Sequence, residues 1–450
     1  MREKAGFYTR LYKEQPMPIC TLPMLNGKLY VINSPSLIHS ALRNNDISFD
    51  PFLTEFSKGM FGQDDRQIAI VDRVMKEVLD IVHSTLLGEP LHKLNTTTLK
   101  LLMKPLNCIQ PNASVQVPNA FLWIRDNTTE AIATALFGEK NPITAEHVHH
   151  LWTFDESATL LAIGVAPNLI APKSVAARNE LNRLLLSYYE AENDQRPDVS
   201  EVIRSRAVVL RREGFSASDL AIQELLLPWV GTTNTIPTLF WLFAELFSRP
   251  DYLERVKAEI EAITTMKSGR GGRTAVIDAR KLEKHCPVLH ACYQETLRVY
   301  IHSVGNRRVM NDTTIQDSEG RKYLMKKGVN VQWPPMVTHF LDSVWGEDAA
   351  TFNPERFLNV TAQEERIRRG AMLPFGGGRH LCPGRKFAFT EILGFVGVVA
   401  LGFEVEGLAL PDSEDPALGS APRRPIWGTR SEGFTLSRRA GWEDVVWTFE

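Results

Sequence analysis

The chain has 450 residues, of which 44% are hydrophobic and 23% are charged, and its formal net charge is -2. This balance suits a large globular protein with a substantial core, and it provides no basic surface for nucleic acid. No apolar run reaches the roughly 18 residues that a membrane span needs, and because the start "MREKAGFYTRLYKE" is polar and basic, we expect no signal peptide. The five cysteines are scattered and odd in number, which favours a reducing compartment over a disulfide framework.

The patterns predict a mostly α protein with a small β region. "CTLPMLNGKLYVIN" (20–33) alternates around an Asn-Gly pair and predicts an early hairpin. Helical spacing behind cap-like residues follows in the segments 34–44, 120–138, 176–193, 199–214, 216–227 and 249–263. Residues 265–275 predict a surface loop, 307–333 predict short strands, and 407–425 predict a loop before a last strand region. With no repeat and no long linker, we expect a single domain spanning residues 1–450.

A polar run interrupts the long apolar helical pattern "WVGTTNTIPTLFWLF". Pro237 lacks the N–H that would bond the carbonyl of Thr233, so the pattern predicts a kink. Thr232, Thr233, Asn234 and Thr235 cluster at that kink, and a polar group in a buried helix calls for a functional reason. The alternative is a capped bend between two helices.

Two charged motifs follow. In "HACYQETLRVY", Glu295 and Arg298 share one face of a predicted helix and can pair. An isolated pair of this kind is usually an ordinary exposed ion pair. In "FNPERFL", Arg356 lies among aromatic residues in an irregular segment, where an arginine is usually a local packing brace.

The stretch "FGGGRHLCPG" (375–384) combines three glycines, two basic residues and one cysteine. Consecutive glycines let the main chain approach a partner closely. Pro383 favours a helix start directly after Cys382, and the N-terminus of a helix stabilises a thiolate. The pattern therefore predicts that Cys382 is a metal ligand or a nucleophile.

Taken in this order and at these distances, the polar central helix, E-T-L-R, P-E-R-F and the cysteine loop resemble the cytochromes P450 over nearly the whole chain. The central helix is most similar to the branch of the cholesterol 7α-hydroxylases, the sterol 12α-hydroxylases and prostacyclin synthase. The resemblance implies the P450 fold, with haem between the kinked helix and the cysteine loop. It implies that Cys382 is the thiolate ligand of the haem iron.

The resemblance also implies the other contacts. Phe375 aligns with the aromatic residue beside the thiolate, and Arg307 and His380 align with contacts to the haem propionates. Glu295, Arg298 and Arg356 match a buried structural charge triad. The loop glycines that would approach the haem are Gly376, Gly378 and Gly384.

Two departures from the family pattern bear on the reaction. Most members carry an acid followed by threonine at the kink, whereas this chain has Asn234 followed by Thr235. Asparagine can hold a water but cannot supply a proton. The second departure is that no Trp-x-x-x-Arg haem contact is recognisable in 88–104, where His92 or Lys93 could replace it.

The resemblance implies a haem b monooxygenase that oxidises a lipophilic small molecule, such as a sterol, terpenoid or polycyclic secondary metabolite. Dioxygen is the oxidant, and electrons come from NADPH through a separate reductase, with cytochrome b5 as a further donor. The alternatives are an oxygen-independent P450 isomerase or dehydratase and a non-catalytic haem-thiolate protein. We expect a monomer at the endoplasmic reticulum membrane, facing the cytosol, whose membrane anchor is missing from this sequence. The residues expected to line the substrate pocket are Phe56, Met60, Phe61, Leu226, Val230, Thr233, Ile301, His302, Val304, Trp427 and Thr429.

Overall fold

The computed structural model describes residues 6–25, 27–269, 272–416, 421–426 and 432–450. The chain is mostly helical (56%) with small sheets, as predicted. It divides into two compact units, which we name by their main content. The sheet unit comprises Met1–Leu53, Ala291–Cys382 and Ser413–Ile426, and the helical unit comprises Thr54–His290, Pro383–Asp412 and Trp427–Glu450. Two helices belong partly to each unit, α3 (Asp50–Ser57) and α17 (Pro287–Tyr300). A single domain over the whole chain stays a prediction.

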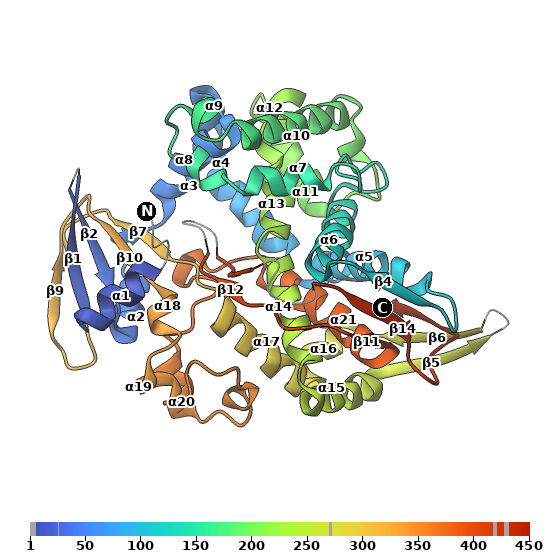
Figure 1. Ribbon diagram of the computed structural model, residues 1–450. Coiled ribbons are helices and arrows are strands. Elements are labelled where there is room, and N and C mark those ends of the chain that lie inside the picture. The colour runs from blue at the N-terminus through green and yellow to red at the C-terminus, as the bar shows by residue number, and fades with distance from the viewer. Residues whose placement is uncertain (1–5, 26, 270–271, 417–420, 427–431) are drawn as a thin grey trace. The chain divides into compact units, whose positions relative to one another are not determined.

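The sheet unit is built around a five-stranded sheet in the order β1-β2-β10-β7-β3. Strands β2 and β10 pair in parallel, and Figure 1 shows these blue and yellow-orange segments side by side. The remaining pairs are antiparallel, including the predicted early hairpin of β1 and β2. The elements of this unit are α1 (Gly6–Glu14), β1 (Ile19–Met24), β2 (Gly27–Ile32), α2 (Pro35–Leu42), β3 (Ile47–Ser48), β7 (Gly305–Val309), β8 (Thr313–Gln316), β9 (Lys322–Met325), β10 (Asn330–Trp333), α18 (Pro335–Thr338), α19 (Asp342–Trp345), η4 (Pro354–Phe357), α20 (Ala362–Arg368), η5 (Gly378–His380), β12 (Ser413–Glu414) and β13 (Arg424–Pro425).

The core of the sheet unit lies between this sheet and α2. Alternate strand residues such as Ile32, Val309 and Val331 are buried against Leu37 and Ile38 of the helix. Burial of each such side chain contributes about 1.5–3 kcal/mol, which fixes the strand register. The core therefore holds β7, and the residues that β7 carries, at a defined place beside α2.

The helical unit contains the long helices. Its elements are η1 (Lys58–Gly62), α4 (Asp65–Thr85), α5 (Gly88–Asn107), β4 (Ser114–Val117), α6 (Ala120–Phe137), α7 (Val148–Asp155), α8 (Ala158–Ala162), α9 (Pro167–Ile170), α10 (Pro172–Glu190), η2 (Asn193–Gln195), α11 (Glu201–Arg212), α12 (Ala217–Glu224), α13 (Leu226–Thr232), α14 (Thr235–Phe247), α15 (Pro250–Ile263), β5 (Thr264–Gly269), β6 (Gly272–Ile277), η3 (Ala279–Lys281), α16 (Leu282–His285), α21 (Arg385–Gly402), β11 (Phe403–Glu406), β14 (Phe434–Arg438) and β15 (Val445–Phe449). Two three-stranded sheets, β11-β14-β4 and β15-β6-β5, complete it.

Helices α5, α6, α14 and α21 pack together in the middle of the helical unit (Figure 1). Helix α14 is buried along nearly its whole length, because most of its residues are apolar and they cover all of its faces. A Cβ at Gly394 of α21 would lie 2.6 Å from Leu99 of α5, so glycine is what lets these two helices approach. The packing therefore buries α14 between α6 and α21.

One sequence prediction about an element was wrong, and two helices were missed. Residues 265–275 were expected to be a surface loop, but β5 (Thr264–Gly269) and β6 (Gly272–Ile277) pair as antiparallel strands. The reason is tertiary, since β6 also pairs in parallel with the C-terminal strand β15. The patterns also did not predict α4 and α5. Among the described residues no helix is both long and apolar enough to cross a membrane.

Candidate active site

The motif around Cys382 folds as a tight loop in the sheet unit. The backbone N–H of Cys382 donates to the carbonyl of Phe375 at 3.0 Å and closes the loop. Gly376 and Gly378 have φ angles of 71° and 65°, so both positions need glycine. A Cβ at Gly378 would lie 2.5 Å from the carbonyl oxygen of Leu42 in α2. The glycines therefore serve a sharp backbone path and a close approach to α2, and they leave Cys382 half-buried at the end of the loop.

Helix α21 begins shortly after this cysteine, as the sequence predicted. Its first residue is Arg385, and Gly384 is its N-cap. The expectation that Pro383 is the first helical residue was wrong. Pro383 lies in the turn before the cap, a place that its fixed φ also suits.

A buried arginine lies beside the cysteine loop. Arg307, on β7, is 6% exposed and donates to the carbonyls of Asn306 at 2.7 Å and Gly377 at 3.3 Å. Its guanidinium carbon stacks over the rings of Phe49 at 5.2 Å and Trp333 at 5.1 Å. No carboxylate of the described part of the chain pairs with it. Arg307 thus keeps a desolvated positive charge without an ion-pair partner among the described residues.

His380 is the second basic group of this cluster. Its Nε2 accepts a hydrogen bond from Nε of Arg379 at 3.1 Å and lies 3.5 Å from Oδ1 of Asp50. Burial lowers the pKa of His380; the charge of Asp50 opposes this, and Arg307 and Arg379 lower the pKa further. Burial likewise lowers the pKa of Arg307 to about 10. Two arginines and a histidine thus share one carboxylate.

These residues fit a haem. The cluster has an excess of positive charge, because Arg307, Arg379 and His380 surround the single carboxylate of Asp50, and the buried guanidinium of Arg307 makes no ion pair with it. A carboxylate such as a haem propionate would supply the missing negative charge, and arginine binds carboxylates well. The same loop carries Cys382, whose sulfur is the type of donor that haem iron accepts. In chemical type, the groups on and beside this loop are those that haem requires.

The structure brings the predicted charge triad together inside the sheet unit. Arg298 donates to both carboxylate oxygens of Glu295, at 2.6 and 2.7 Å, and both side chains are completely buried. Nε of Arg356 lies 3.4 Å from the same carboxylate. An ordinary exposed ion pair, the alternative reading of this motif, is excluded.

The polar run in the central helix is a true interruption. Helix α13 ends at Thr232 and α14 begins at Thr235, so the prediction of a single kinked helix was wrong. The alternative of a bend between two helices is what the structure has, although Asn234, the N-cap of α14, makes no side-chain capping hydrogen bond. Thr233 donates its hydroxyl to the carbonyl of Trp229 at 3.0 Å, and Thr232 does the same to Pro228 at 2.7 Å. These bonds satisfy the two hydroxyls locally.

Thr235 and Asn234 differ from these two threonines. No side-chain hydrogen bond joins either of them to another described residue. Thr235 is 7% exposed, and Asn234 is exposed. Each therefore has a polar group available to a water molecule or a ligand, at the point where Pro237 also leaves the Thr233 carbonyl without its helical donor.

The predicted pocket residues fall into different surroundings. In the helical unit, Val230 is 43% exposed and Phe56 is 39% exposed, as a lining residue would be. Met60 and Phe61 are buried, and Phe61 packs edge-on against Trp229. Leu226 is half-buried and Thr233 is buried.

In the sheet unit, Ile301 and His302 are buried, and Val304 is half-buried. The ring of His302 is 2% exposed, lies edge-on to Phe340 and has a pKa lowered by burial. His302 is thus part of this unit's interior, and little of its surface is left for a ligand. Two further predicted residues, Trp427 and Thr429, lie outside the described residues.

His92 and Lys93, the suggested replacements for the missing haem contact, lie on α5. His92 is half-buried and Lys93 is exposed, and neither forms a hydrogen bond or an ion pair with another described residue. Their role stays a prediction.

Sequence reasoning missed Asp50, Phe49, Trp333 and Arg379 around the basic cluster. Three of them lie far from the motif in the chain, and nothing in the sequence links them to it. Arg379 lies inside the motif and could have been considered.

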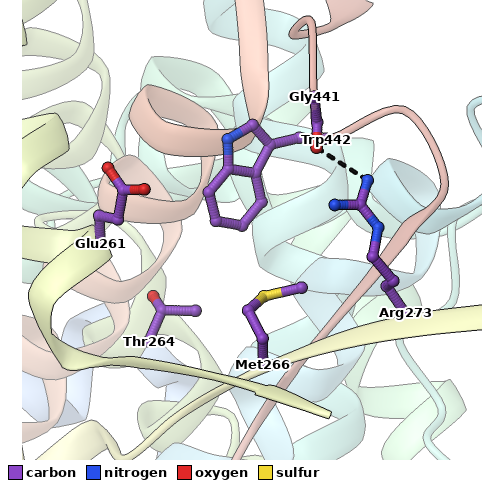
Figure 2. A pocket seen from close by; sticks show the side chains of 6 residues that line it. All are labelled: Glu261, Thr264, Met266, Arg273, Gly441 and Trp442. Carbon is purple, nitrogen blue, oxygen red and sulfur yellow. Dashed lines mark hydrogen bonds between the residues drawn. The ribbon is translucent and has the colours of Figure 1, made fainter. Parts of the chain in front are cut away.

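A separate cavity of about 370 Å³ lies in the helical unit (Figure 2). The arginine of this cavity already has partners in the protein, because Arg273 pairs with Asp444 at 2.9 Å and donates to the carbonyl of Gly441 at 2.8 Å. The cavity contains no nucleophile and no acid–base pair, and we assign it no catalytic role. Its lining residues are Glu261, Thr264, Met266, Arg273, Gly441 and Trp442.

Comparison with known proteins decides the family. The model of the family "Cytochrome P450" matches residues 2–425. The chain belongs to the cytochrome P450 family. As a cytochrome P450 it is an enzyme of the monooxygenase class, and the family implies a haem-thiolate centre and a redox partner.

Among its relatives, this P450 is 35% identical to a cytochrome P450 monooxygenase of Gibberella zeae, over 100% of this chain and 88% of the relative. It is 26% identical to cytochrome P450 monooxygenase nodJ of Hypoxylon pulicicidum, over 99% of this chain and 87% of the relative. It is also 25% identical to cholesterol 7-alpha-monooxygenase of Cricetulus griseus, over 72% of this chain and 67% of the relative. The predicted likeness to the cholesterol 7α-hydroxylase branch is thereby confirmed.

Proposed function

We propose that this P450 inserts one oxygen atom of dioxygen into a lipophilic small molecule, of the sterol, terpenoid or polycyclic secondary-metabolite class. The second oxygen atom leaves as water and takes up two protons and two electrons. NADPH supplies the electrons through a separate reductase, with cytochrome b5 as a further donor. The enzyme works as a monomer at the endoplasmic reticulum membrane with its catalytic part in the cytosol.

We propose that the cofactor is haem b, which supplies the activation of dioxygen when it is bound. Cys382 would be its thiolate ligand, and Phe375 would pack beside the sulfur. Arg307 would pair with one propionate, because its buried guanidinium makes no ion pair with a described carboxylate. His380 would hydrogen-bond the other propionate.

The interruption between α13 and α14 carries this proposal. Oxidation with release of water needs protons delivered into a water-poor site, and a positioned group contributes typically about 10²–10⁴ in rate to such a transfer. Thr235 is 7% exposed, and no side-chain hydrogen bond joins its hydroxyl to another described residue, so this hydroxyl can hold a water molecule and pass a proton. Asn234 can orient that water with its amide, but it cannot release a proton itself.

The substrate would be held by apolar side chains. Val230 and Phe56 offer exposed apolar surface in the helical unit. We propose that Met60, Phe61, Leu226 and Thr233 of the same unit also contact the substrate. A substrate contact from Ile301, His302 or Val304 stays a prediction.

Turnover of a lipophilic panel with NADPH and reductase tests this function. In Thr235→Ala, product formation should fall about 10²–10⁴-fold while NADPH oxidation continues and releases hydrogen peroxide. Asn234→Asp adds the acid that the interruption lacks and should at least preserve product formation.

One observation favours an alternative reaction. Because Asn234 replaces the acid, a rearrangement that needs no proton delivery is chemically compatible with the interruption. Such an oxygen-independent isomerase or dehydratase would turn over under argon without NADPH, and Thr235→Ala would leave its rate unchanged. That result would replace the monooxygenase proposal.

A further inference from the structure

The short π-helical turn η1 packs closely against the backbone of α8 in the helical unit. A Cβ at Gly59 would lie 2.5 Å from the carbonyl oxygen of Leu161 and 2.9 Å from that of Ala162, so η1 presses directly on the backbone of α8. Its last residue, Gly62, has a φ of 77°. Two of its five residues therefore have to be glycine, and α8 blocks any movement of η1 toward it.

Arg178 of α10 also holds this turn. Its Nη1 donates to the carbonyl of Met60 at 3.1 Å and to that of Gly59 at 3.3 Å. Carbonyls at the end of a helical turn carry partial negative charge and favour a cation there. Glycine at position 62 leaves room for the guanidinium, whose Cζ would lie 3.1 Å from a Cβ.

The charge of Arg178 has no acidic partner among the described residues. Its Nε is buried and makes no hydrogen bond there, and burial lowers the pKa of the guanidinium. The two carbonyls of η1 are thus the groups that satisfy this cation. Arg178 thus interacts with η1 through hydrogen bonds to backbone carbonyls and not through an ion pair.

Phe61, which lies between Met60 and Gly62 in η1, connects this turn to two helices of the unit. The ring of Phe61 lies edge-on to Trp229 of α13 at 5.8 Å and packs on Phe154 of α7 at 5.9 Å. The indole N–H of Trp229 donates to Asp155 at 2.9 Å, which fixes the ring from the other side.

Trp229 in turn adjoins the interruption of the central helix. Its carbonyl accepts the backbone N–H of Thr233 at 3.1 Å and the hydroxyl of Thr233 at 3.0 Å. The hydroxyl of Thr232 lies within 3.3 Å of the same oxygen. A continuous series of contacts thus runs from Arg178 through η1, Phe61 and Trp229 to the polar residues between α13 and α14.

We propose that Arg178 is a positioning residue for the oxidation. By holding η1, it keeps Phe61 against Trp229 and so fixes the Thr232–Thr235 segment in the geometry that delivers protons, a role that rests on the proposed function. Arg178 touches neither substrate nor cofactor in this role.

Hydrogen exchange of the haem-loaded enzyme without substrate tests the contacts themselves. In Arg178→Met the amides of residues 58–62 and 230–235 should exchange about tenfold faster, because charge-assisted hydrogen bonds are lost. Arg178→Lys keeps the cation and should retain most of the protection. Arg183→Met is the matched control, since Arg183 lies on the same helix, is 61% exposed and pairs with Glu180.

Phe61→Leu tests the contact between Phe61 and Trp229 separately from the contact between Arg178 and η1. It should leave residues 58–60 protected by Arg178 while residues 230–235 exchange faster. It also keeps the proposal testable if Arg178→Met does not fold. Unchanged exchange at 230–235 in Phe61→Leu, or at 58–62 in a folded Arg178→Met, would overturn the proposal.

The ratio of product formed to NADPH oxidised tests the functional role of Arg178. With a substrate that the panel identifies, product formed per NADPH oxidised should fall several-fold in Arg178→Met at unchanged haem content, and Arg178→Lys should restore it. An unchanged ratio in Arg178→Met would overturn the positioning role. Exchange is measured without substrate, so it judges the contacts even if the panel shows a different reaction.

Discussion

Replacing Glu295 with alanine is expected to cost about 3 kcal/mol of folding stability, at the lower end of the roughly 3–5 kcal/mol seen when one partner of a buried ion pair is removed. Arg298 would keep its charge in a place where it is completely buried. Three carbonyls would still solvate it, those of Ala349 at 2.7 Å, His339 at 2.8 Å and Thr351 at 3.2 Å. These acceptors are the reason for choosing the lower end.

Urea unfolding of the purified protein, followed by circular dichroism, measures this loss. The free energy of unfolding of a typical domain is only about 5–15 kcal/mol, so Glu295→Ala should also lower the yield of protein that is soluble and loaded with haem. Glu295→Gln keeps the shape and can still accept the N–H of Asn353, which now donates to Glu295 at 2.8 Å, so it should lose less.

Arg356→Met is the matched control. Arg356 has a nearer acid, Asp348 at 2.6 Å, than Glu295 at 3.4 Å, and its removal leaves the Glu295–Arg298 pair intact. We expect a loss of about 1–2 kcal/mol. The reasoning is refuted if Glu295→Ala unfolds at the wild-type urea concentration, or if Arg356→Met is the more damaging change.

Three further changes have defined outcomes. Cys382→Ser should abolish the strongly red-shifted Soret band of the reduced carbon monoxide complex, since serine is a poor donor to iron; an unchanged spectrum would remove Cys382 as the ligand. Burial raises the pKa of Asp219, but hydrogen bonds from Arg66, Ser216 and Gln67 outweigh it and bring the pKa from 3.8 down to about 2. The folded state thus favours the carboxylate. Wild type should therefore have a higher free energy of unfolding than Asp219→Asn above pH 4, and this difference should disappear as the pH falls toward 2. Burial raises the pKa of Glu391 well above its ordinary 4.5, and neither of its oxygens has a hydrogen-bond partner in the described chain. The folded state therefore binds the proton of Glu391 more tightly than the unfolded chain does, and wild type loses stability as the pH rises above 4.5. In thermal melts, the melting temperature of Glu391→Gln relative to wild type should therefore rise with pH. A gain that does not grow with pH would contradict this.

What the sequence made predictable was local. The cysteine loop is one continuous motif, and Glu295 and Arg298 are three residues apart on one helix, so their pairing follows from helix geometry. The hairpin of β1 and β2 follows in the same way from alternation around a turn.

What the sequence could not reveal depends on distant partners. The β5–β6 hairpin looks like a glycine-rich loop, and it becomes a strand pair because β15, at the other end of the chain, pairs with it. Asp50 reaches His380 across more than 300 positions, and Arg178 reaches η1 across more than 100. No local period or spacing encodes such contacts, since they arise only when the core brings the elements together.

The most direct test of the central claim is turnover in heavy-isotope dioxygen with NADPH and reductase, followed by mass spectrometry of the product. A monooxygenase that uses Cys382 and the Thr235 water inserts one heavy oxygen atom into each product molecule, and Cys382→Ser forms none. Product that forms at the same rate under argon and carries no heavy oxygen would contradict the account.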